Sequence, residues 1–503
     1  MIKQRNILLN GVLPDPWIPI ALHLEQEGHK VSYWIGWGDN GKKELVTSSL
    51  PRTIFHENIL AWKGIQPGES TIKVHQEKML PVEFWNNRSE LLIALKMMDR
   101  LDADGYSFNF SEREDFIFDL ATQWYNTLLN HQIDTVIFSI APHRGFDYII
   151  YLVAKYLGID VLIFKPTFEP SLLYMMEEIQ GEALMLPTKE ITGGVSEKLT
   201  QKCKTFQADR GTTPQYMINQ KKSNNNRAKI GRLTAKLRPG RLFKTDLTAH
   251  KYRHLDYYNL FPKNHATAYA DSYLTLKTLK RLKTNYSRFV SKAEFANNKK
   301  YLLFALHYQP EETTVPSAGN FYNQVSIIKQ LSQQMPDDWI LLVKEHSTQF
   351  HPRFDGHKGR YPDVYSRIHQ LPNVKMLDEN IHSRELIHQV QAIVTLTGTI
   401  GIEALLCRKP VFLFGNSWYK GFKGIINIGD HPELLNDLKG ILNDLPSVSD
   451  KETYNSLEEI TKYLLTAYTY KNYEKYATFD KGQNATIVFR YLVKWFSKKD
   501  SEK

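Results

Sequence analysis

The segment with the clearest chemical potential is Thr397-Gly398-Thr399, which follows an apolar run at residues 392–396 and precedes a predicted helix at residues 399–406. The first N–H groups of such a helix lack partners within the helix, and together with the helix dipole they favour a phosphate. Glu403 lies about one turn into this helix, where its carboxylate could accept both hydroxyls of a ribose. In the simpler alternative, Thr399 only caps the helix and Glu403 is an ordinary acid of its first turn.

A second polar segment, Lys344-Glu345-His346-Ser347, follows a predicted strand at residues 339–343. Lys344 could pair with a phosphate, and His346 could donate a hydrogen bond to a phosphate oxygen or protonate a leaving group. Glu345 and Ser347 lie in the same loop and therefore belong to the same predicted donor site. A satisfied structural histidine, without a catalytic role, is the alternative for His346.

A third segment, which contains Gln309 and Glu311, follows a predicted strand at residues 301–306. Gln309 could recognise the edge of a base or sugar, and Glu311 could contact a sugar or act as a base, although a plain polar loop explains either residue as well. The carboxyl ends of parallel strands lie at one edge of a sheet and line its ligand crevice. We therefore expect the three segments to converge on one site.

Three candidates for a general base lie near the predicted strand ends of the first half of the chain. His143 follows a strand at residues 134–139, Asp147 lies near the start of the next helix, and Asp15 lies between Pro14 and Pro16. We favour His143. The alternatives are a turn for Asp15, a helix cap for Asp147 and a hydrogen bond to a neighbouring loop for His143.

The pattern of apolar runs predicts an α/β protein with two Rossmann-like domains, a facing cleft and a C-terminal crossover helix. The chain opens with a predicted strand, helix and strand, but the loop at residues 10–17 has one glycine where a dinucleotide fingerprint needs three. This argues against a nicotinamide-dependent oxidoreductase. We expect a Rossmann-like acceptor domain at residues 1–190, a basic helical insertion at 191–299, a Rossmann-like nucleotide-sugar domain at 300–449, and helices at 450–503 that pack back on the first domain.

These segments resemble the capsule-polysaccharide biosynthesis family, which includes the bacterial Kdo transferases. The matching pieces in the second domain are Tyr308-Gln309-Pro310-Glu311, Lys344-Glu345-His346, Leu371-Pro372-Asn373-Val374, Thr397-Gly398-Thr399, Gly401, Glu403-Ala404-Leu405 and Lys409-Pro410-Val411. In the first domain Pro142-His143, Ala154-Lys155 and Gly158-Ile159 are similar too. Ser347 departs from the pattern, because members of the family typically have proline after the histidine.

The resemblance implies a GT-B glycosyltransferase that holds a donor nucleotide mainly on the C-terminal domain and an acceptor on the N-terminal one. It implies no obligatory metal and no cofactor besides the nucleotide-sugar donor. The expected reaction transfers a sugar, best a CMP-activated ulosonic acid such as Kdo, to a growing bacterial surface polysaccharide or its lipid-linked acceptor. A UDP-sugar-dependent transferase, a nucleotide-sugar epimerase and a membrane-docked scaffold of a polysaccharide assembly complex are the alternatives.

The charge of the chain adds one further expectation. The formal net charge is +10, and residues 221–244 hold nine Lys or Arg and no Asp or Glu. A solvated linker, a patch for anionic lipid and a nucleic-acid surface are the three interpretations, and without a nucleic-acid motif we expect no nucleic-acid partner. Two cysteines and the absence of an apolar leader or a long apolar run predict a cytoplasmic protein, peripheral on the inner face of the inner membrane if residues 221–244 bind lipid.

Overall fold

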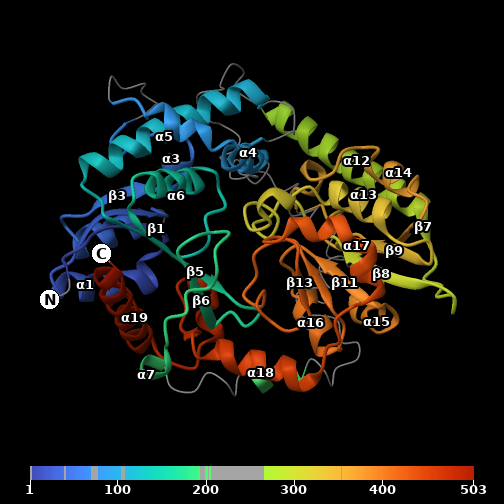
Figure 1. Cartoon of the computed structure of the whole chain (residues 1–503). Coiled ribbons are helices and arrows are strands. Elements are labelled where there is room, and N and C mark those ends of the chain that lie inside the picture. Colours follow the sequence, from blue (N-terminus) through green and yellow to red (C-terminus); the bar gives the residue numbers. More distant parts are fainter. Residues whose placement is uncertain are drawn as a thin grey trace, which may run out of the picture.

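The computed structural model describes residues 3–38, 41–69, 78–102, 108–192, 199–201, 203–205, 265–352 and 354–502. Within these ranges the chain forms two lobes, each built around its own sheet (Figure 1). The basic segment at residues 221–244 and most of the predicted insertion lie outside the described residues.

The first sheet has the strand order β14-β6-β5-β4-β1-β2-β3. Its five strands from β5 to β3 are parallel, and β6 and β14 add an antiparallel edge. The bounds are β1 Asn6–Val12, β2 Lys30–Gly36, β3 Ile54–Glu57, β4 Thr135–Phe138, β5 Asp160–Pro166, β6 Leu172–Met176 and β14 Leu465–Thr466.

The second sheet has the order β13-β12-β11-β8-β9-β10-β7, and all of its strand pairs are parallel. Its central strands are almost continuously apolar because helices cover both faces. The bounds are β7 Val290–Ser291, β8 Lys300–Ala305, β9 Trp339–Lys344, β10 Val374–Leu377, β11 Ala392–Thr395, β12 Val411–Leu413 and β13 Ile425–Asn427.

Each sheet reverses its winding direction once. The change falls between β1 and β4 in the first sheet and between β8 and β11 in the second. Connections leave such a switch point in opposite directions, so the loops that follow these strands open a crevice beyond their carboxyl ends. The residues after β4, β8 and β11 therefore lie where a ligand is expected.

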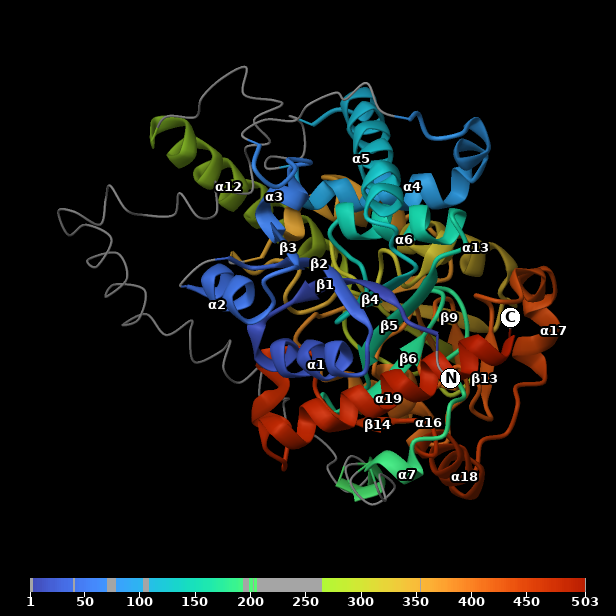
Figure 2. The same ribbon diagram turned by 90° about the vertical axis from the view of Figure 1, so that its left-hand side faces the viewer.

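The helices lie on both faces of each sheet and in the connections between the lobes (Figures 1 and 2). In the first lobe they are α1 Pro14–Gln26, α2 Lys42–Ser49, α3 Asn58–Trp62, α4 Arg88–Met97, α5 Phe110–Asn130, α6 Phe146–Tyr156 and α7 Lys189–Thr192. The later helices are α12 His265–Phe289, α13 Gln324–Gln334, α14 Val364–His369, α15 Ser383–Gln389, α16 Ile400–Leu406, α17 Leu438–Asn443, α18 Asp450–Thr461 and α19 Lys481–Glu502. Short 3-10 helices are η1 Val82–Asn86, η2 Met98–Arg100, η4 Gly319–Phe321, η5 Gly356–Lys358, η6 Pro432–Asp437 and η7 Lys471–Tyr476.

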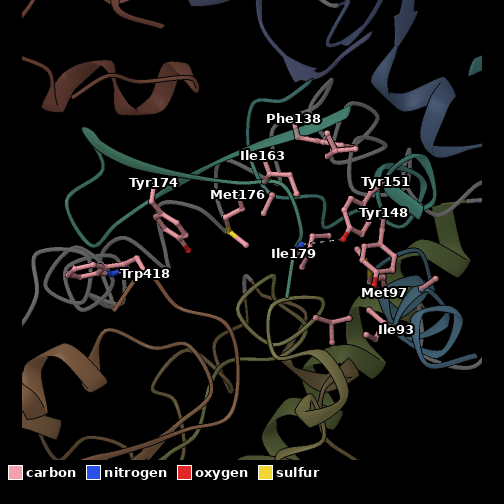
Figure 3. Close-up of a cluster of buried hydrophobic side chains, with 14 of the residues drawn as sticks. Ile93, Met97, Phe138, Tyr148, Tyr151, Ile163, Tyr174, Met176, Ile179 and Trp418 are labelled. Atoms are coloured by element: carbon pink, nitrogen blue, oxygen red, sulfur yellow. Dashed lines mark hydrogen bonds between the residues drawn. The ribbon is translucent and has the colours of Figure 1, made fainter. Parts of the chain in front are cut away.

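One buried core is continuous across the two lobes. It contains Phe138 and Ile163 of the first sheet together with Leu303 and Leu342 of the second. Trp418 of the second lobe, which Figure 3 shows at the edge of this core, stacks on Phe168 of the first with 5.8 Å between ring centroids. The lobes are therefore held together by apolar packing as well as by polar contacts.

Helix α19 returns from the second lobe to pack beside α1 on the first (Figure 2). Its apolar residues recur every three or four positions and form one buried face: Ala485, Val488, Tyr491, Leu492, Trp495 and Phe496. Asn484 fixes the start of this face, because its amide bonds to both the N–H and the carbonyl of Tyr468. The predicted α/β fold with two Rossmann-like units and a C-terminal crossover helix is confirmed.

Replacing Leu492 with alanine should lower the free energy of unfolding by about 2–5 kcal/mol, because the side chain is fully buried and leaves a cavity. Arg490, an exposed residue of the same helix, provides the control, and Arg490→Ala should leave stability within about 0.5 kcal/mol of wild type. Urea denaturation followed by tryptophan fluorescence measures both. Equal midpoints for the two variants would show that α19 does not stabilise the first lobe.

Candidate functional site

A buried ion pair organises the carboxyl edge of the second sheet. Glu345, directly after β9, is fully buried and accepts two hydrogen bonds from Arg360, at 2.8 Å from Nε and 3.0 Å from Nη2. Its oxygens also accept from the hydroxyl of Tyr365 at 2.7 Å and from the backbone N–H of His346 at 2.8 Å. Glu345 was predicted to bind the donor nucleotide, and this is wrong because its carboxylate is enclosed by protein donors.

Arg360 extends the same network to the loop after β8. Its Nη1 donates to Oε1 of Gln309 at 2.6 Å, and its Nη2 donates to the carbonyl of His307 at 3.1 Å. The Gln309 amide nitrogen donates to the carbonyl of Tyr322 at 2.9 Å. Both ends of the buried Gln309 side chain are therefore bonded within the protein, and its recognition of a base or sugar stays a prediction.

His307 joins the two strands at the switch point of this sheet. Its Nε2 accepts a hydrogen bond from the N–H of Leu396 at 3.1 Å and lies 3.0 Å from Oγ1 of Thr395. Burial lowers the pKa of His307 to about 3, so the ring stays neutral. Gly398 is required beside it, because a Cβ there would lie 2.9 Å from Oγ1 of Thr395 and 3.0 Å from Cε1 of His307.

The Thr397-Gly398-Thr399 loop is tied to its neighbours through its first two residues. Thr397 Oγ1 donates to the carbonyl of Thr313 at 2.9 Å, and the Gly398 N–H donates to Oγ1 of Thr395 at 3.1 Å. Thr399 is exposed and makes no side-chain cap to α16, so the capping alternative is wrong for this residue. Its hydroxyl interacts instead with Glu403.

Glu403 is the most perturbed carboxyl of this edge. Burial raises its pKa to about 7, although Arg384, whose Nε lies 3.8 Å from Oε2, opposes the shift. The group can therefore donate as well as accept a hydrogen bond near neutral pH. Such a carboxyl beside an exposed threonine could pair with the hydroxyls of a sugar or ribose.

His346 is held in the tautomer in which Nε2 carries the proton and can donate a hydrogen bond. Nδ1 lies 2.7 Å from Oγ1 of Thr348 and accepts from the Thr348 N–H at 3.3 Å, which leaves the proton of the neutral ring on Nε2. Burial lowers the pKa of His346 to about 4. Of the two predicted roles, donation of a hydrogen bond to a phosphate oxygen fits this neutral ring, and delivery of a full proton does not.

Lys344 and Ser347, which lie close to His346 along the chain, differ in whether their side chains already have a hydrogen-bond partner within the described residues. Lys344 is buried and its Nζ donates to the carbonyl of Glu379 at 3.3 Å, so the protein itself already supplies a partner at the place where a phosphate was predicted. Ser347 has a buried hydroxyl that finds no hydrogen-bond partner within the described ranges. An unsatisfied hydroxyl beside His346 is a candidate contact for a ligand.

Glu311, in the loop after β8, is exposed, and its carboxylate accepts a hydrogen bond from Oγ1 of Thr313 at 3.0 Å.

At the edge of the first sheet, His143 has the opposite tautomer. Its Nδ1 lies 2.8 Å from the carbonyl of Ala141 and must donate to it, so Nε2 carries the free lone pair. Burial lowers the pKa of His143 below its ordinary value, which keeps the ring unprotonated at neutral pH. The ring is therefore in the state that a general base needs.

The other two candidate bases have structural roles. Asp147 accepts hydrogen bonds from the backbone N–H groups of His143, Arg144 and Tyr148 at 2.7–2.9 Å, as its cap alternative predicted. Asp15 follows β1 by three residues, in the non-helical start of α1, and pairs with Lys481 of α19. Neither carboxylate is a free base, and the structure does not bring Asp15 together with His143.

The carboxyl edges of the two sheets meet through an ion pair that the sequence did not indicate. Lys165, at the end of β5, lies 2.9 Å from Oε1 of Glu312 in the loop after β8. Burial alone would lower the pKa of Lys165, but the adjacent carboxylate raises it. His143, in turn, is near enough to Glu312 that a proton on its ring would lower the pKa of that carboxylate.

Three further contacts cross the same gap. Arg100 Nη2 donates to the carbonyl of Val315 at 3.1 Å, and the Gln180 amide donates to the carbonyl of Pro316 at 2.7 Å. Asn416 donates to the carbonyls of Ile179 and Gly181 at 2.8 and 2.7 Å. Segments of the two lobes at the carboxyl edges of their sheets are therefore in direct contact.

Two other observations complete the description. Within the described ranges, no helix combines the length and apolar character that crossing a membrane requires. In the same part of the chain, no cluster of three or more His, Cys, Asp or Glu residues is placed to hold a metal ion.

Two Rossmann-like sheets whose carboxyl edges face each other, with a final helix that returns to the first, define the GT-B architecture. The family model described as capsule polysaccharide biosynthesis protein matches residues 215–428. This range includes every motif of the second domain on which the resemblance was based. The resemblance to this family is thereby confirmed.

Curated proteins match shorter parts of the chain. The capsule polysaccharide modification protein LipA of Neisseria meningitidis serogroup B is 28% identical over 137 residues, 27% of this chain and 17% of that protein. Protein FixF of Sinorhizobium fredii is 35% identical over 104 residues, 21% of this chain and 23% of its own length. The chain thus spans less than a quarter of the length of these relatives.

Solved structures resemble the chain at low scores. The S. aureus MnaA–UDP co-structure is 12% identical, with 92% of each chain covered and a TM-score of 0.22. Thermosulfurimonas dismutans KpsC, a beta Kdo 2,7 transferase, is 10% identical, with 74% of this chain and 89% of that chain covered and a TM-score of 0.29.

Removing one partner of the buried ion pair should be strongly destabilising. Arg360→Ala leaves the Glu345 carboxylate buried without its cation and should lower the free energy of unfolding by about 3–5 kcal/mol. Arg367→Ala removes an exposed arginine paired with Asp363 and should leave the urea midpoint unchanged. If Arg360→Ala unfolded at the same urea concentration as wild type, the network could not be holding these loops.

The raised pKa of Glu403 makes stability depend on pH. The unfolded state ionises this carboxyl near its ordinary value of 4.5, whereas the folded state keeps it protonated until about pH 7. Stability from this group is therefore complete below pH 4.5 and is lost as pH rises through 7, by up to about 3 kcal/mol. Glu403→Gln should remove this slope in denaturation curves measured from pH 4.5 to 8, and Glu385→Gln, at an exposed position of α15, should retain it.

Proposed function

We propose that the chain is a metal-independent GT-B glycosyltransferase that holds a nucleotide-activated sugar at the second sheet and a saccharide acceptor at the first. The observation that carries the proposal is the meeting of the loops that follow β4 and β5 with the loop that follows β8. A donor bound at one switch point is then next to an acceptor bound at the other. Similarity to capsule polysaccharide proteins supports a bacterial surface polysaccharide, or its lipid-linked precursor, as the acceptor.

The two histidines have complementary hydrogen-bonding states for such a reaction. His143 presents a lone pair at Nε2 and can accept the proton of the acceptor hydroxyl in an inverting displacement. His346 presents an N–H at Nε2 and can donate to the phosphate oxygen on which charge develops as the sugar–phosphate bond breaks. The acceptor oxygen forms the new glycosidic bond as the nucleotide leaves.

The donor site of this proposal lies between His346 and α16. Ser347 and Thr399 offer hydroxyls, Glu403 offers a carboxyl for the ribose, and exposed Glu311 reaches the sugar from the neighbouring loop. The preferred donor is a CMP-activated ulosonic acid such as Kdo, on the strength of the motif resemblance. A UDP-sugar is the competing donor.

Residues 221–244, outside the described ranges, are proposed to hold the enzyme at an anionic membrane surface by their positive charge.

The proposal is tested with a panel of CMP- and UDP-activated sugars, each assayed in the presence of EDTA. We expect one nucleotide class to raise the melting temperature, because a ligand at about 100 times its dissociation constant stabilises the folded state by roughly 2.7 kcal/mol. We also expect transfer to an oligosaccharide acceptor, followed by mass spectrometry. Release of a changed nucleotide sugar without acceptor would contradict the proposal and indicate an epimerase, and loss of transfer in EDTA would contradict metal independence.

Substitution of the histidines tests their separate roles. His346→Ala should lower turnover by about 10²–10³ while the dissociation constant of the nucleotide changes little, because its bond strengthens as charge develops. His143→Ala should lower turnover by about 10²–10⁴ and remove an acidic limb that lies below pH 6.5, since burial lowers the pKa of this base. His431→Ala, at an exposed position, is the control. Full turnover and an unchanged pH profile in His143→Ala would show that His143 is not the base.

A further inference from the structure

Arg144 carries a charge that the protein leaves without a hydrogen-bonding partner. Its guanidinium lies 5.2 Å from the ring centroid of Trp37 and 5.6 Å from that of Trp62. Among the described residues its side chain forms no hydrogen bond and no ion pair, and only its backbone N–H is bonded, to Asp147. The two rings hold the cation in place while all of its N–H donors remain available.

Arg100 provides a second guanidinium nearby with an unused donor. Its Nη1 is buried and has no partner in the described part of the chain, although its Nη2 donates to the carbonyl of Val315. Burial lowers the pKa of Arg100, and the charge of Arg144 lowers it further, so the two cations interact unfavourably. A buried N–H of a charged group that lacks an acceptor is costly and calls for a ligand.

The nearby carboxylates are occupied by other groups. Asp147 accepts from three backbone N–H groups, and Glu312 is paired with Lys165 and Ser317. Glu311 accepts from Thr313. These acids moderate the positive potential, but none makes an ion pair with either arginine within the part of the chain that the structure describes. An external anion would satisfy both guanidinium groups at once.

A further unpartnered group lies on helix α3, one turn from Trp62. Asn58 is 1% exposed, and among the residues that the structure describes neither its amide oxygen nor its amide nitrogen has a hydrogen-bond partner. It opens helix α3, and Trp62 follows four residues later on the same face of that helix. An aromatic wall, a free guanidinium and a free amide on the acceptor side of the cleft form the pattern that recognises a sugar with an acidic substituent.

We propose that Arg144, with Arg100, Trp37, Trp62 and Asn58, forms a subsite for an anionic sugar residue of the acceptor, one that bears a carboxylate or a phosphate. This inference rests on the proposed glycosyltransferase function and specifies its acceptor class. The acidic group pairs with the arginines, and the sugar ring lies against the tryptophans. The neighbouring hydroxyl of the acceptor is then directed toward Nε2 of His143, one residue before Arg144.

The test compares three probes by titration calorimetry: a disaccharide ending in a ulosonic acid, the same type of disaccharide carrying a phosphate, and its neutral counterpart. Wild type should bind at least one acidic probe more tightly than the neutral one, and the acidic probe that binds identifies carboxylate or phosphate as the recognised group. Arg144→Ala should weaken that binding at least tenfold and leave the neutral probe unchanged. Arg144→Lys should retain part of the affinity, because it keeps the charge but loses the planar donors.

Arg88→Ala is the matched control, since it removes an exposed arginine of the same lobe and should leave all three affinities unchanged. The midpoint of urea denaturation checks that each variant is folded, and the affinity for the stabilising nucleotide should be unaltered in Arg144→Ala. Equal binding of the acidic probes by wild type and Arg144→Ala, or no preference of wild type for acidic probes at millimolar concentration, would overturn the inference. Loss of nucleotide affinity in Arg144→Ala would assign the anion to the donor instead. Failure of every nucleotide to bind would contradict the proposed function, independently of the saccharide result.

Discussion

The buried pair of Glu345 and Arg360 is the interaction on which the second lobe's ligand-binding edge depends. Removing two charges from water costs several kcal/mol for each ion, so such a pair is tolerated only when hydrogen bonds satisfy its remaining atoms. Here they do. The carboxylate accepts from Arg360, Tyr365 and a backbone N–H, and the guanidinium also reaches the loop after β8. One ion pair therefore sets the relative positions of loops from separate strands, and it presents the next residue, His346, toward the cleft.

The proposed division of roles between the two lobes rests on local hydrogen bonds of two histidines. A carbonyl beside Nδ1 of His143 fixes one tautomer, and a hydroxyl with an N–H beside Nδ1 of His346 fixes the other. Burial keeps both rings neutral. In the proposed reaction His143 acts as the base for the acceptor hydroxyl, and His346 donates a hydrogen bond to the leaving phosphate. The phosphate is then displaced from the sugar carbon without receiving a full proton from His346. The first lobe adds arginine donors that other described residues leave unbonded, and these carry the proposed preference for an anionic acceptor.

Much of the fold could be predicted from the sequence, because strands β1, β4, β8, β9 and β11 are short apolar runs bounded by glycine or polar residues, and their helices have clear periodicity. The site was harder to predict. A polar residue after a strand has the same sequence signature whether it binds a ligand or a distant part of the chain, and for this reason Gln309 and Glu345 were assigned to the donor. Their partner Arg360 lies 15 residues beyond Glu345 in a segment without periodicity. Lys165 and Glu312 give no sequence signal of their pairing, since only the docking of the two lobes brings them together.

The central claim is that a nucleotide binds at the switch point of the second sheet while an acceptor binds across the cleft at the first. The most direct measurement is a crystal structure of the protein with the CMP or UDP nucleotide that stabilises it. The account predicts nucleotide density beyond β9 and β11, with a phosphate oxygen within hydrogen-bonding distance of Nε2 of His346 and the ribose beside Glu403. Density for the nucleotide between Arg144 and His143, with the edge of the second sheet empty, would contradict it.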